Sequence, residues 1–218
     1  MDPIPFLTDI LLPALGEGVI ITIALILAAA PFGCLLGIGV AVGRTYGSRP
    51  VSLLTRGFVA FVKGCPLLLL LFILYFGLPS IGIRFTPFLA ATVGFIFCNG
   101  AYNSEYIRGA LLSVKEGQMI AASALGMTRA QAIRHIILPQ ALRRAIPGMT
   151  NEFIYLIKYS SLAYMITVVE LTGAGKLVAT KYFMYNETFL VVGIVYLALV
   201  TVTTLGANFL ERRFAVPT

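Results

Sequence analysis

The sequence predicts an all-α membrane protein with five transmembrane helices, and two observations carry that prediction. Of the 218 residues, 59% are hydrophobic and only 11% are charged, and the mean hydropathy is +0.93, far from the averages of soluble domains. The apolar residues also gather into five segments, each close to the ~20 residues that a helix needs to cross a bilayer. We therefore treat residues 1–218 as one membrane domain.

The five predicted spans differ in how regular they are. The first is an uninterrupted apolar run whose small residues, such as Gly33 and Gly37, favour close helix packing. The second contains Lys63 and Pro66, and the proline is expected to kink the helix just past the lysine. Pro147 is expected to open the fourth. The spans cover residues 19–42, 57–78, 88–110, 148–171 and 188–209.

The basic residues predict how the spans are oriented. Cytoplasmic loops of membrane proteins carry an excess of lysine and arginine, and here eleven basic residues fall on one side and three on the other. This places the N-terminus outside and residues 116–139 in the cytoplasm. It also explains the net charge of +7, so no nucleic-acid partner is expected. The eleven are Arg44, Arg49, Arg56, Arg108, Lys115, Arg129, Arg134, Arg143, Arg144, Arg212 and Arg213, and the three are Arg84, Lys176 and Lys181.

The longest polar interval, residues 116–139, lies between the third and fourth spans. Alanines around Ala122 favour a helix, and Gly126 can take the left-handed conformation that ends it. Thr128 is a plausible N-cap for a second helix, which Pro139 then breaks or kinks. Two short helices at a corner form a rigid knob suited to docking against another protein. An ordinary solvated helical loop is the alternative.

This interval resembles the EAA loop of permease subunits in ATP-binding-cassette importers. That motif reads Glu-Ala-Ala, three residues, Gly, nine residues, Ile, one residue, Leu-Pro. Ile120 occupies the glutamate position. The positions that match are Ala121, Ala122, Gly126, Ile136, Leu138 and Pro139. Further segments similar to permeases for polar amino acids are residues 117–118, 138–144, 151–153 and 158–162.

The resemblance implies a multi-pass, non-catalytic permease subunit in a bacterial cytoplasmic (inner) membrane. Its implied partners are a dimer of ATPase subunits, a second permease subunit, identical or different, and an extracytoplasmic solute-binding protein. The implied substrate is an amino acid. The chain carries no nucleotide-binding motif, so ATP and Mg are expected in the partner ATPase, with no cofactor on this chain. Coupling to the ATPase is implied for Ile120, Ala121, Ala122, Gly126, Ile136, Leu138 and Pro139.

The third and fourth spans contain polar and charged residues. A charged group at the middle of a membrane helix costs about 2.5–3.5 kcal/mol on insertion scales, and such groups usually face a cavity or a partner. Glu105 and Arg108 are three apart, so they share a helix face and can pair. For Lys63, Arg108 and Glu170 we favour a structural role or snorkelling to water. The predicted substrate pathway comprises Asn99, Asn103, Glu105, Glu152, Lys158, Ser160 and Ser161.

Two other functions are compatible with five polar-lined spans. A self-sufficient, ion-coupled secondary transporter would use Glu105 and Glu152 for proton coupling, although no internal repeat of the kind common in such transporters is visible. A membrane scaffold protein would have no pathway at all. The three cysteines lack disulfide or metal spacing, and His135 is the only histidine, so no metal site is predicted.

Overall fold

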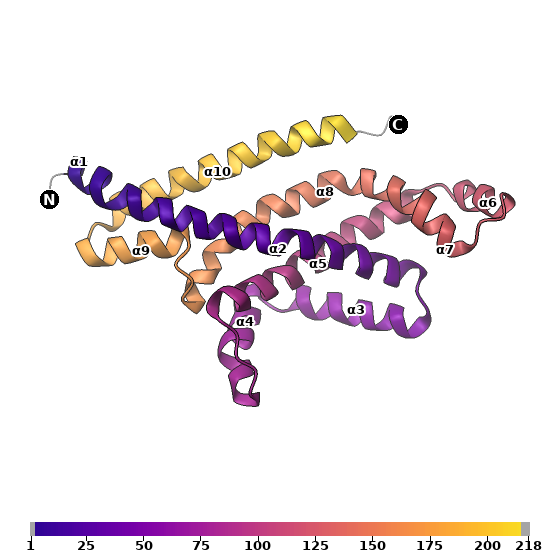
Figure 1. Cartoon of the computed structure of the whole chain (residues 1–218), viewed down its shortest axis with the longest axis horizontal. Helices are drawn as coiled ribbons and strands as arrows, with labels where there is room; N and C mark the ends of the chain where they lie inside the picture. Colours follow the sequence, from indigo (N-terminus) through magenta and orange to yellow (C-terminus); the bar gives the residue numbers. More distant parts are fainter. Residues whose placement is uncertain (1–2, 215–218) are drawn as a thin grey trace.

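The structure, a computed structural model, describes residues 3–214, and every regular element in that range is helical. Most of the helices run along one common axis, whereas the segment labelled α4 turns away from it (Figure 1). In chain order the elements are α1 (Pro3–Pro5), η1 (Phe6–Leu11), α2 (Leu12–Tyr46), α3 (Arg49–Gly64), α4 (Leu67–Phe72), η2 (Ile73–Gly77), η3 (Leu78–Ile81), α5 (Pro87–Ser113), α6 (Gly117–Ala124), α7 (Arg129–Ala132), η4 (Ile133–Ile137), α8 (Leu138–Tyr159), η5 (Ser160–Ile166), α9 (Leu171–Tyr182) and α10 (Tyr185–Phe214).

The first predicted span lies within a longer helix, because η1 and α2 form one element of 41 residues. It packs along α5, where small residues allow the two backbones to approach. A Cβ added to Gly37 would lie 2.8 Å from the Cβ of Asn103, and one added to Gly33 would overlap the Asn99 amide. The close packing expected of these glycines is therefore present, and it brings α2 against the polar face of α5.

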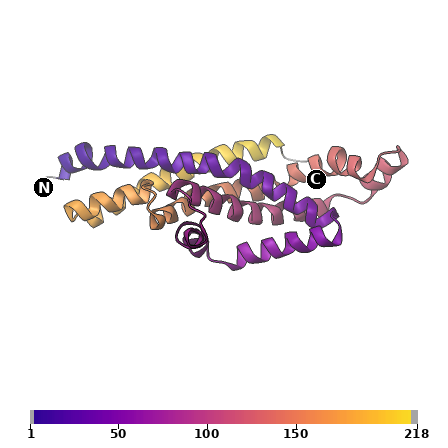
Figure 2. The same cartoon turned by 60° about the horizontal axis from the view of Figure 1, so that its bottom comes forward.

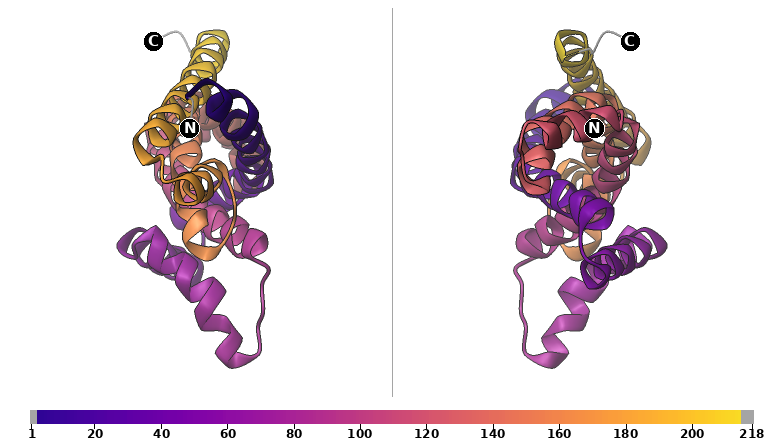
Figure 3. Two further views of the ribbon diagram at one scale, coloured as in Figure 1. Left: turned by 90° about the vertical axis from the view of Figure 1, so that its left-hand side faces the viewer. Right: turned by 90° about the vertical axis from the view of Figure 1, so that its right-hand side faces the viewer.

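The second predicted span is broken. The helix α3 and the segment α4–η3 meet at 103°, with Cys65 extended at φ −94° and ψ 128° before Pro66. A proline lacks the N–H that would continue the helix and disfavours helical geometry in the residue before it. The break is where we expected a kink, but residues 57–78 do not form one continuous helix. The α4 segment projects away from the bundle in both end views (Figure 3).

The helix after the polar interval does not stop at Pro139. A π-helical turn, η4, leads directly into α8 with Pro139 in its first turn, and Pro147 lies inside α8 rather than at the start of a span. A proline has no N–H, so it leaves a backbone carbonyl of the preceding turn without its usual donor. A local π-helical turn lets such a carbonyl accept a hydrogen bond from another backbone N–H. Pro139 therefore does not break the helix, and the irregularity next to it is a π-helical turn. The helix that holds Pro147 begins before that residue, and the start of the fourth span at Pro147 stays a prediction.

The fourth predicted span, residues 148–171, also ends differently. The α-helix gives way to the 3₁₀ helix η5, and Thr167 takes a left-handed φ of 70° before the chain turns into α9. The helical stretch Arg129–Ile166 and α9 are bent by 50°. The fifth span, residues 188–209, lies inside α10.

Two helices of the described chain, η1–α2 and α10, are long and apolar enough to span a membrane. Four elements qualify if each bent pair counts as one span. The helices α6 and α7 lie at one end of the bundle, with the corner between α2 and α3 (Figure 2). The start of α2 and the whole of α9 lie toward the other end (Figure 1).

Candidate functional site

The knob at one end of the bundle, α6–α7 (residues 117–132), is built around Gly126. This glycine has a φ of 78°, the left-handed conformation that we predicted for it and that side chains rarely adopt. The N–H of Gly126 donates to the Ser123 carbonyl at 3.0 Å, and that of Met127 donates to the Ala122 carbonyl at 3.1 Å. These bonds satisfy carbonyls that the end of α6 leaves free.

The next helix starts at Thr128, as predicted. The Thr128 hydroxyl accepts from the Gln131 N–H at 3.3 Å, and the Gln131 side chain accepts from the Thr128 N–H at 2.8 Å. This is a complete capping box, in which two unpaired backbone donors are satisfied reciprocally. Our prediction from the sequence did not include Gln131, although the Thr-x-x-Gln spacing carries the signal.

The knob has a buried face and an exposed apolar face. Ala122 is 2% exposed and Ala132 is fully buried, whereas Ile120 is 65% and Leu125 82% exposed. Ala121 is also exposed. Large apolar side chains that project from a rigid, otherwise polar turn are typical of a protein docking site.

Contacts with three helices hold the knob in place. Ile136 and Leu138 are half-buried against a core that contains Ile137, whereas Pro139 is exposed. The Arg129 guanidinium lies 5.8 Å from the centre of the Tyr46 ring, at the end of α2. Further along, Arg144 of α8 donates to the carbonyl and hydroxyl oxygens of Ser113, the last residue of α5. The Arg129 contact therefore joins the knob directly to the end of α2, and the Arg144 bonds join α8 to α5 beside it.

The predicted pair of Glu105 and Arg108 is present, at 3.2 Å, and it has a third member. Arg44, near the end of α2, donates to the other carboxylate oxygen of Glu105 at 2.5 Å. The sequence pattern placed Arg44 in a loop, so this contact was not predicted. The triad lies where α2 and α5 approach the knob, whereas Lys158 lies at the far end of α8. The structure therefore separates Glu105 from Lys158, whereas Asn99 and Asn103 lie on the same helix as Glu105.

The two asparagines of the predicted pathway lie in the interface between helices. Asn103 donates its side-chain N–H to the Asn99 carbonyl oxygen at 2.8 Å, and each residue is 3% exposed. The Oδ1 of Asn103 has no hydrogen-bond partner in the described chain. Their position against α2 fits helix packing better than contact with a solute.

Glu152 is the least satisfied charged residue of the site. It lies on α8 and is 2% exposed, and its Oε1 has no hydrogen-bond partner in residues 3–214. The amino group of Lys63, on α3, lies 5.3 Å from the centre of the Tyr102 ring of α5. An unpaired buried carboxylate oxygen is costly.

The remaining pathway residues divide between a cavity and the core. Lys158 and Ser161 line a cavity of about 410 Å³ against α10, with the Lys158 amino group 5.1 Å from the centre of the Tyr155 ring. Ser161 donates to the Lys158 carbonyl at 2.8 Å. Ser160 is fully buried and donates to the Ile157 carbonyl, so it does not line this cavity.

Glu170 has a structural role, as we favoured. Its two carboxylate oxygens accept from the backbone N–H groups of Thr172 and Gly173 and from the Tyr196 hydroxyl, each at 2.9 Å. The adjacent N–H of Leu171 donates to the hydroxyl of Thr22 on α2 at 3.1 Å. Thr22 and Tyr196 were not predicted, because nothing in their local sequence pattern indicates a partner so distant along the chain. Together these groups tie α2, α9 and α10.

No group of three or more His, Cys, Asp or Glu side chains suited to a metal ion occurs among residues 3–214. The candidate site therefore consists of an exposed apolar turn, an ion-pair triad and a cavity in which Lys158, Ser161 and Tyr196 lie among apolar residues.

Comparisons with known proteins agree with this geometry. Residues 33–216 match the family described as binding-protein-dependent transport system inner membrane component. The chain is 36% identical over 203 residues to the probable amino-acid ABC transporter permease protein YckA of Bacillus subtilis, covering 93% of this chain and 90% of that one. It is 34% identical to the glutamine transport system permease protein GlnP of Escherichia coli K12, over 94% of each chain.

Solved structures share the fold. A chain of an amino acid ABC transporter crystallised with histidines has a TM-score of 0.88 at 29% identity, covering 98% of this chain and 99% of that one. A chain of the MetNI methionine ABC transporter, at 23% identity, has a TM-score of 0.77 over 94% of this chain and 98% of its own. From the family match and from these relatives we conclude that the chain belongs to the inner membrane permease components of binding-protein-dependent ABC transport systems.

Proposed function

We propose that this permease component serves an ATP-driven importer of polar amino acids. The observation that carries the proposal is the rigid knob with its exposed Ile120 and Leu125, joined to a bundle that contains a lysine-lined cavity. The relatives named for amino-acid and glutamine transport support the substrate class. The family assignment accounts for the chain without an ion-coupled carrier or a scaffold role.

In this proposal five spans cross the membrane, with the N-terminus outside and the α6–α7 knob in the cytoplasm. The support is the clustering of basic residues near the knob end, because cytoplasmic loops are enriched in them. The two elements bent at Pro66 and at Thr167 each count as one span, which makes four with η1–α2 and α10. The helix α5 (Pro87–Ser113) is the proposed fifth.

The partners follow from this orientation. The knob docks on a dimer of ATPase subunits, which hold the ATP and Mg. A second permease subunit completes the translocation pathway, and a solute-binding protein delivers the amino acid from outside. The docking contact includes Ile120, so it relies on burial where a glutamate would form a charged hydrogen bond.

The mechanism we propose is alternating access driven by the ATPase. Closure of the ATPase pair moves the knob, and Arg129, Arg144 and the Arg44–Glu105–Arg108 triad pass that movement to the ends of α2, α5 and α8. The ATPase can shift the permease only by its differential contacts with the two permease states. Glu105 therefore acts in transmission rather than in solute contact.

The solute contacts we propose are at the other end of α8. Lys158, with Ser161, would meet the carboxylate of an amino acid in the cavity against α10. The unpaired carboxylate of Glu152 would meet a cationic group, either of the solute or of Lys63 in another state. Ser160, Asn99 and Asn103 would shape the helices around the pathway.

Replacement of Gly126 tests the docking role. A side chain at a φ of 78° is strained, and valine adds a β-branch. Gly117→Val is the matched control, because Gly117 lies in the same knob, has no positive φ and, like Gly126, has open space where a Cβ would be added. We expect Gly126→Val to insert normally but to lose the co-purifying ATPase, whereas Gly117→Val retains it.

The docking proposal fails if Gly126→Val matches the parent in both ATPase retention and amino-acid uptake. Ile120→Glu, assayed at low and high salt, then reports the chemistry of the contact. A contact made by burial keeps its strength as salt rises, because screening acts on exposed charges.

A further inference from the structure

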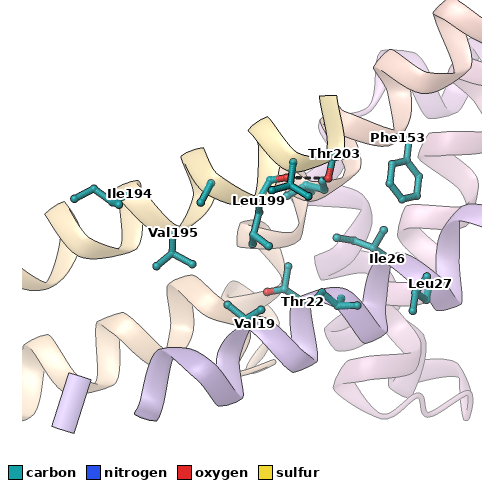
Figure 4. Close-up of a pocket in the computed structure, with 13 residues that line it drawn as sticks. Val19, Thr22, Ile26, Leu27, Phe153, Ile194, Val195, Leu199 and Thr203 are labelled. Atoms are coloured by element: carbon teal, nitrogen blue, oxygen red, sulfur yellow. Dashed lines mark hydrogen bonds between the residues drawn. The ribbon is translucent and has the colours of Figure 1, made fainter. Parts of the chain in front are cut away.

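An apolar groove runs between α10 and the helices α2 and α8 (Figure 4). One part of it has a volume of about 520 Å³, and a second part of about 560 Å³ continues it along α8 and α10. Phe153 and Thr203 line both parts, so the groove is continuous. Almost all of its remaining lining is aliphatic.

The groove lies on the side of α10 away from the lysine-lined cavity. Val195, Leu199 and Val202 line the groove, whereas Gly193, Leu197 and Val200 line the cavity with Lys158. Residues two apart on a helix are separated by about 200°. The groove therefore faces away from the proposed pathway, on a helix whose most apolar window is only 6% buried.

Two arginines flank the end of the groove that lies nearest the knob. Arg143 is three residues from Ile146 on α8, and Arg213 is three residues from Leu210 on α10; both apolar residues line the groove. Residues three apart share a helix face. Both arginines are exposed, and within residues 3–214 neither belongs to an ion pair or a side-chain hydrogen bond.

The neighbouring charges are engaged or point elsewhere. Glu211 accepts from the Thr150 hydroxyl at 2.5 Å, a contact that joins α8 and α10 at this same end. Arg212 is two residues from Leu210 and so lies on the other side of α10. The mouth of the groove therefore presents two cationic groups from two helices beside an apolar channel, together with the Glu211 carboxylate that accepts from the groove-lining Thr150.

We infer that this groove binds an anionic phospholipid, with one acyl chain between α10 and α8 and the phosphate between Arg143 and Arg213. From Val195 to Leu210 the groove follows α10 for about 22 Å at ~1.5 Å per residue, longer than one leaflet of about 15 Å, so a whole acyl chain fits. A neutral lipid could fill the apolar part but would leave both arginines unpaired. The phosphate would then lie in the cytoplasmic leaflet, an assignment that rests on the proposed cytoplasmic position of the knob.

The test uses the assembled transporter, purified in mild detergent from a membrane that contains phosphatidylglycerol, with its bound lipids extracted and quantified. A juxtamembrane arginine contributes about fivefold to anionic-lipid affinity (about 1 kcal/mol). We expect Arg143→Gln and Arg213→Gln each to lower retained phosphatidylglycerol about fivefold. Arg212→Gln, on the other side of α10, should match the parent.

A second pair of variants fills the groove instead of changing its charge. Gly206 lines the groove and has open space where a Cβ would be added, so Gly206→Leu should displace the acyl chain without a clash inside the chain. Gly39→Leu is the control, because Gly39 of α2 is equally open but lies outside the groove. We expect only Gly206→Leu to lower retained lipid.

Equal phosphatidylglycerol in the parent, Arg143→Gln, Arg213→Gln and Gly206→Leu would overturn the inference. Efficient formation of a disulfide between the cysteine of Gly206→Cys and a cysteine of a second permease subunit would also overturn the inference, because that subunit would then occupy the groove. ATPase retention and uptake are measured on the same samples. If the variants retain as much phosphatidylglycerol as the parent while the ATPase co-purifies normally, only the lipid site is contradicted. If no ATPase co-purifies with the parent, the proposed function is contradicted.

Discussion

Two buried glutamates, Glu170 and Glu152, occupy opposite kinds of environment. Glu170 is fully buried, and both of its oxygens accept hydrogen bonds from backbone and side-chain donors. Glu152 is 2% exposed, yet its Oε1 has no partner in the described chain. Both are acids inside the fourth predicted span, where the sequence predicted a structural role for Glu170 and a place in the pathway for Glu152.

The difference is between an acid whose hydrogen bonds stabilise the fold and an acid whose burial destabilises it. Satisfied buried hydrogen bonds to a charged group contribute about 1.5–3 kcal/mol, and an unsatisfied buried polar group costs about 1–3 kcal/mol. The fold therefore gains from Glu170 and loses from Glu152. An acid retained at such a cost is expected to act in transport.

The largest expected effect on stability is that of Glu170→Gln. The amide keeps one acceptor oxygen, but its N–H₂ group then faces N–H or O–H donors. The N-cap of α9 is therefore lost, and at least one buried N–H or hydroxyl has no acceptor. We expect a loss of about 2–3 kcal/mol in the free energy of unfolding, measured by thermal denaturation of the purified complex. An unchanged melting temperature would show that the Glu170 cluster is not a structural tie.

Tyr196→Phe should have a smaller effect of the same sign. It removes one donor to Glu170 and one contact with the Thr172 hydroxyl, while the ring and the cap remain. We expect a loss of about 1 kcal/mol by the same denaturation assay. Tyr164→Phe is a suitable control, since no side-chain hydrogen bond of Tyr164 is found in residues 3–214. A loss as large as that of Glu170→Gln would mean that the tyrosine, not the carboxylate, organises the cluster.

Lys158→Ala should leave stability nearly unchanged and impair uptake. Lys158 is exposed in the isolated chain and lines the cavity against α10, so its removal leaves no buried group unpaired and even lowers the cost of insertion. Amino-acid uptake at matched membrane levels is the measurement, with Lys176→Ala as a control on α9. Equal uptake by Lys158→Ala and the parent would remove Lys158 from the pathway.

The smallest effect on stability is expected for Glu152→Gln. This variant compares the two glutamates most directly. A neutral amide is less costly to bury than a carboxylate, so the melting temperature should not fall. Uptake should nevertheless fall, by about tenfold if one charged contact of about 1.4 kcal/mol is lost. A fall in melting temperature comparable with that of Glu170→Gln would place both acids in the structural class.

Several features of this protein could be read directly from local sequence. The left-handed Gly126, the cap at Thr128 and the Glu105–Arg108 pair all depend on residues within four positions of one another, and the structure confirms them. The apolar segments likewise identified the long helices. Local hydrogen bonding and helix periodicity decide such features before the chain packs.

The sequence alone predicted a helical membrane chain with a loop that resembles a docking motif and with acids within its spans. Tertiary structure decided what those acids do. It brought Arg44 to Glu105 and Thr22 and Tyr196 to the turn at Glu170, and it left Glu152 without a partner. It also decided that the helix continues through Pro139, whereas the break at Pro66 lies where the sequence predicted a kink. The physical reason is that a buried polar group is satisfied by whatever donor packing brings within about 3 Å, and that donor can come from anywhere in the chain.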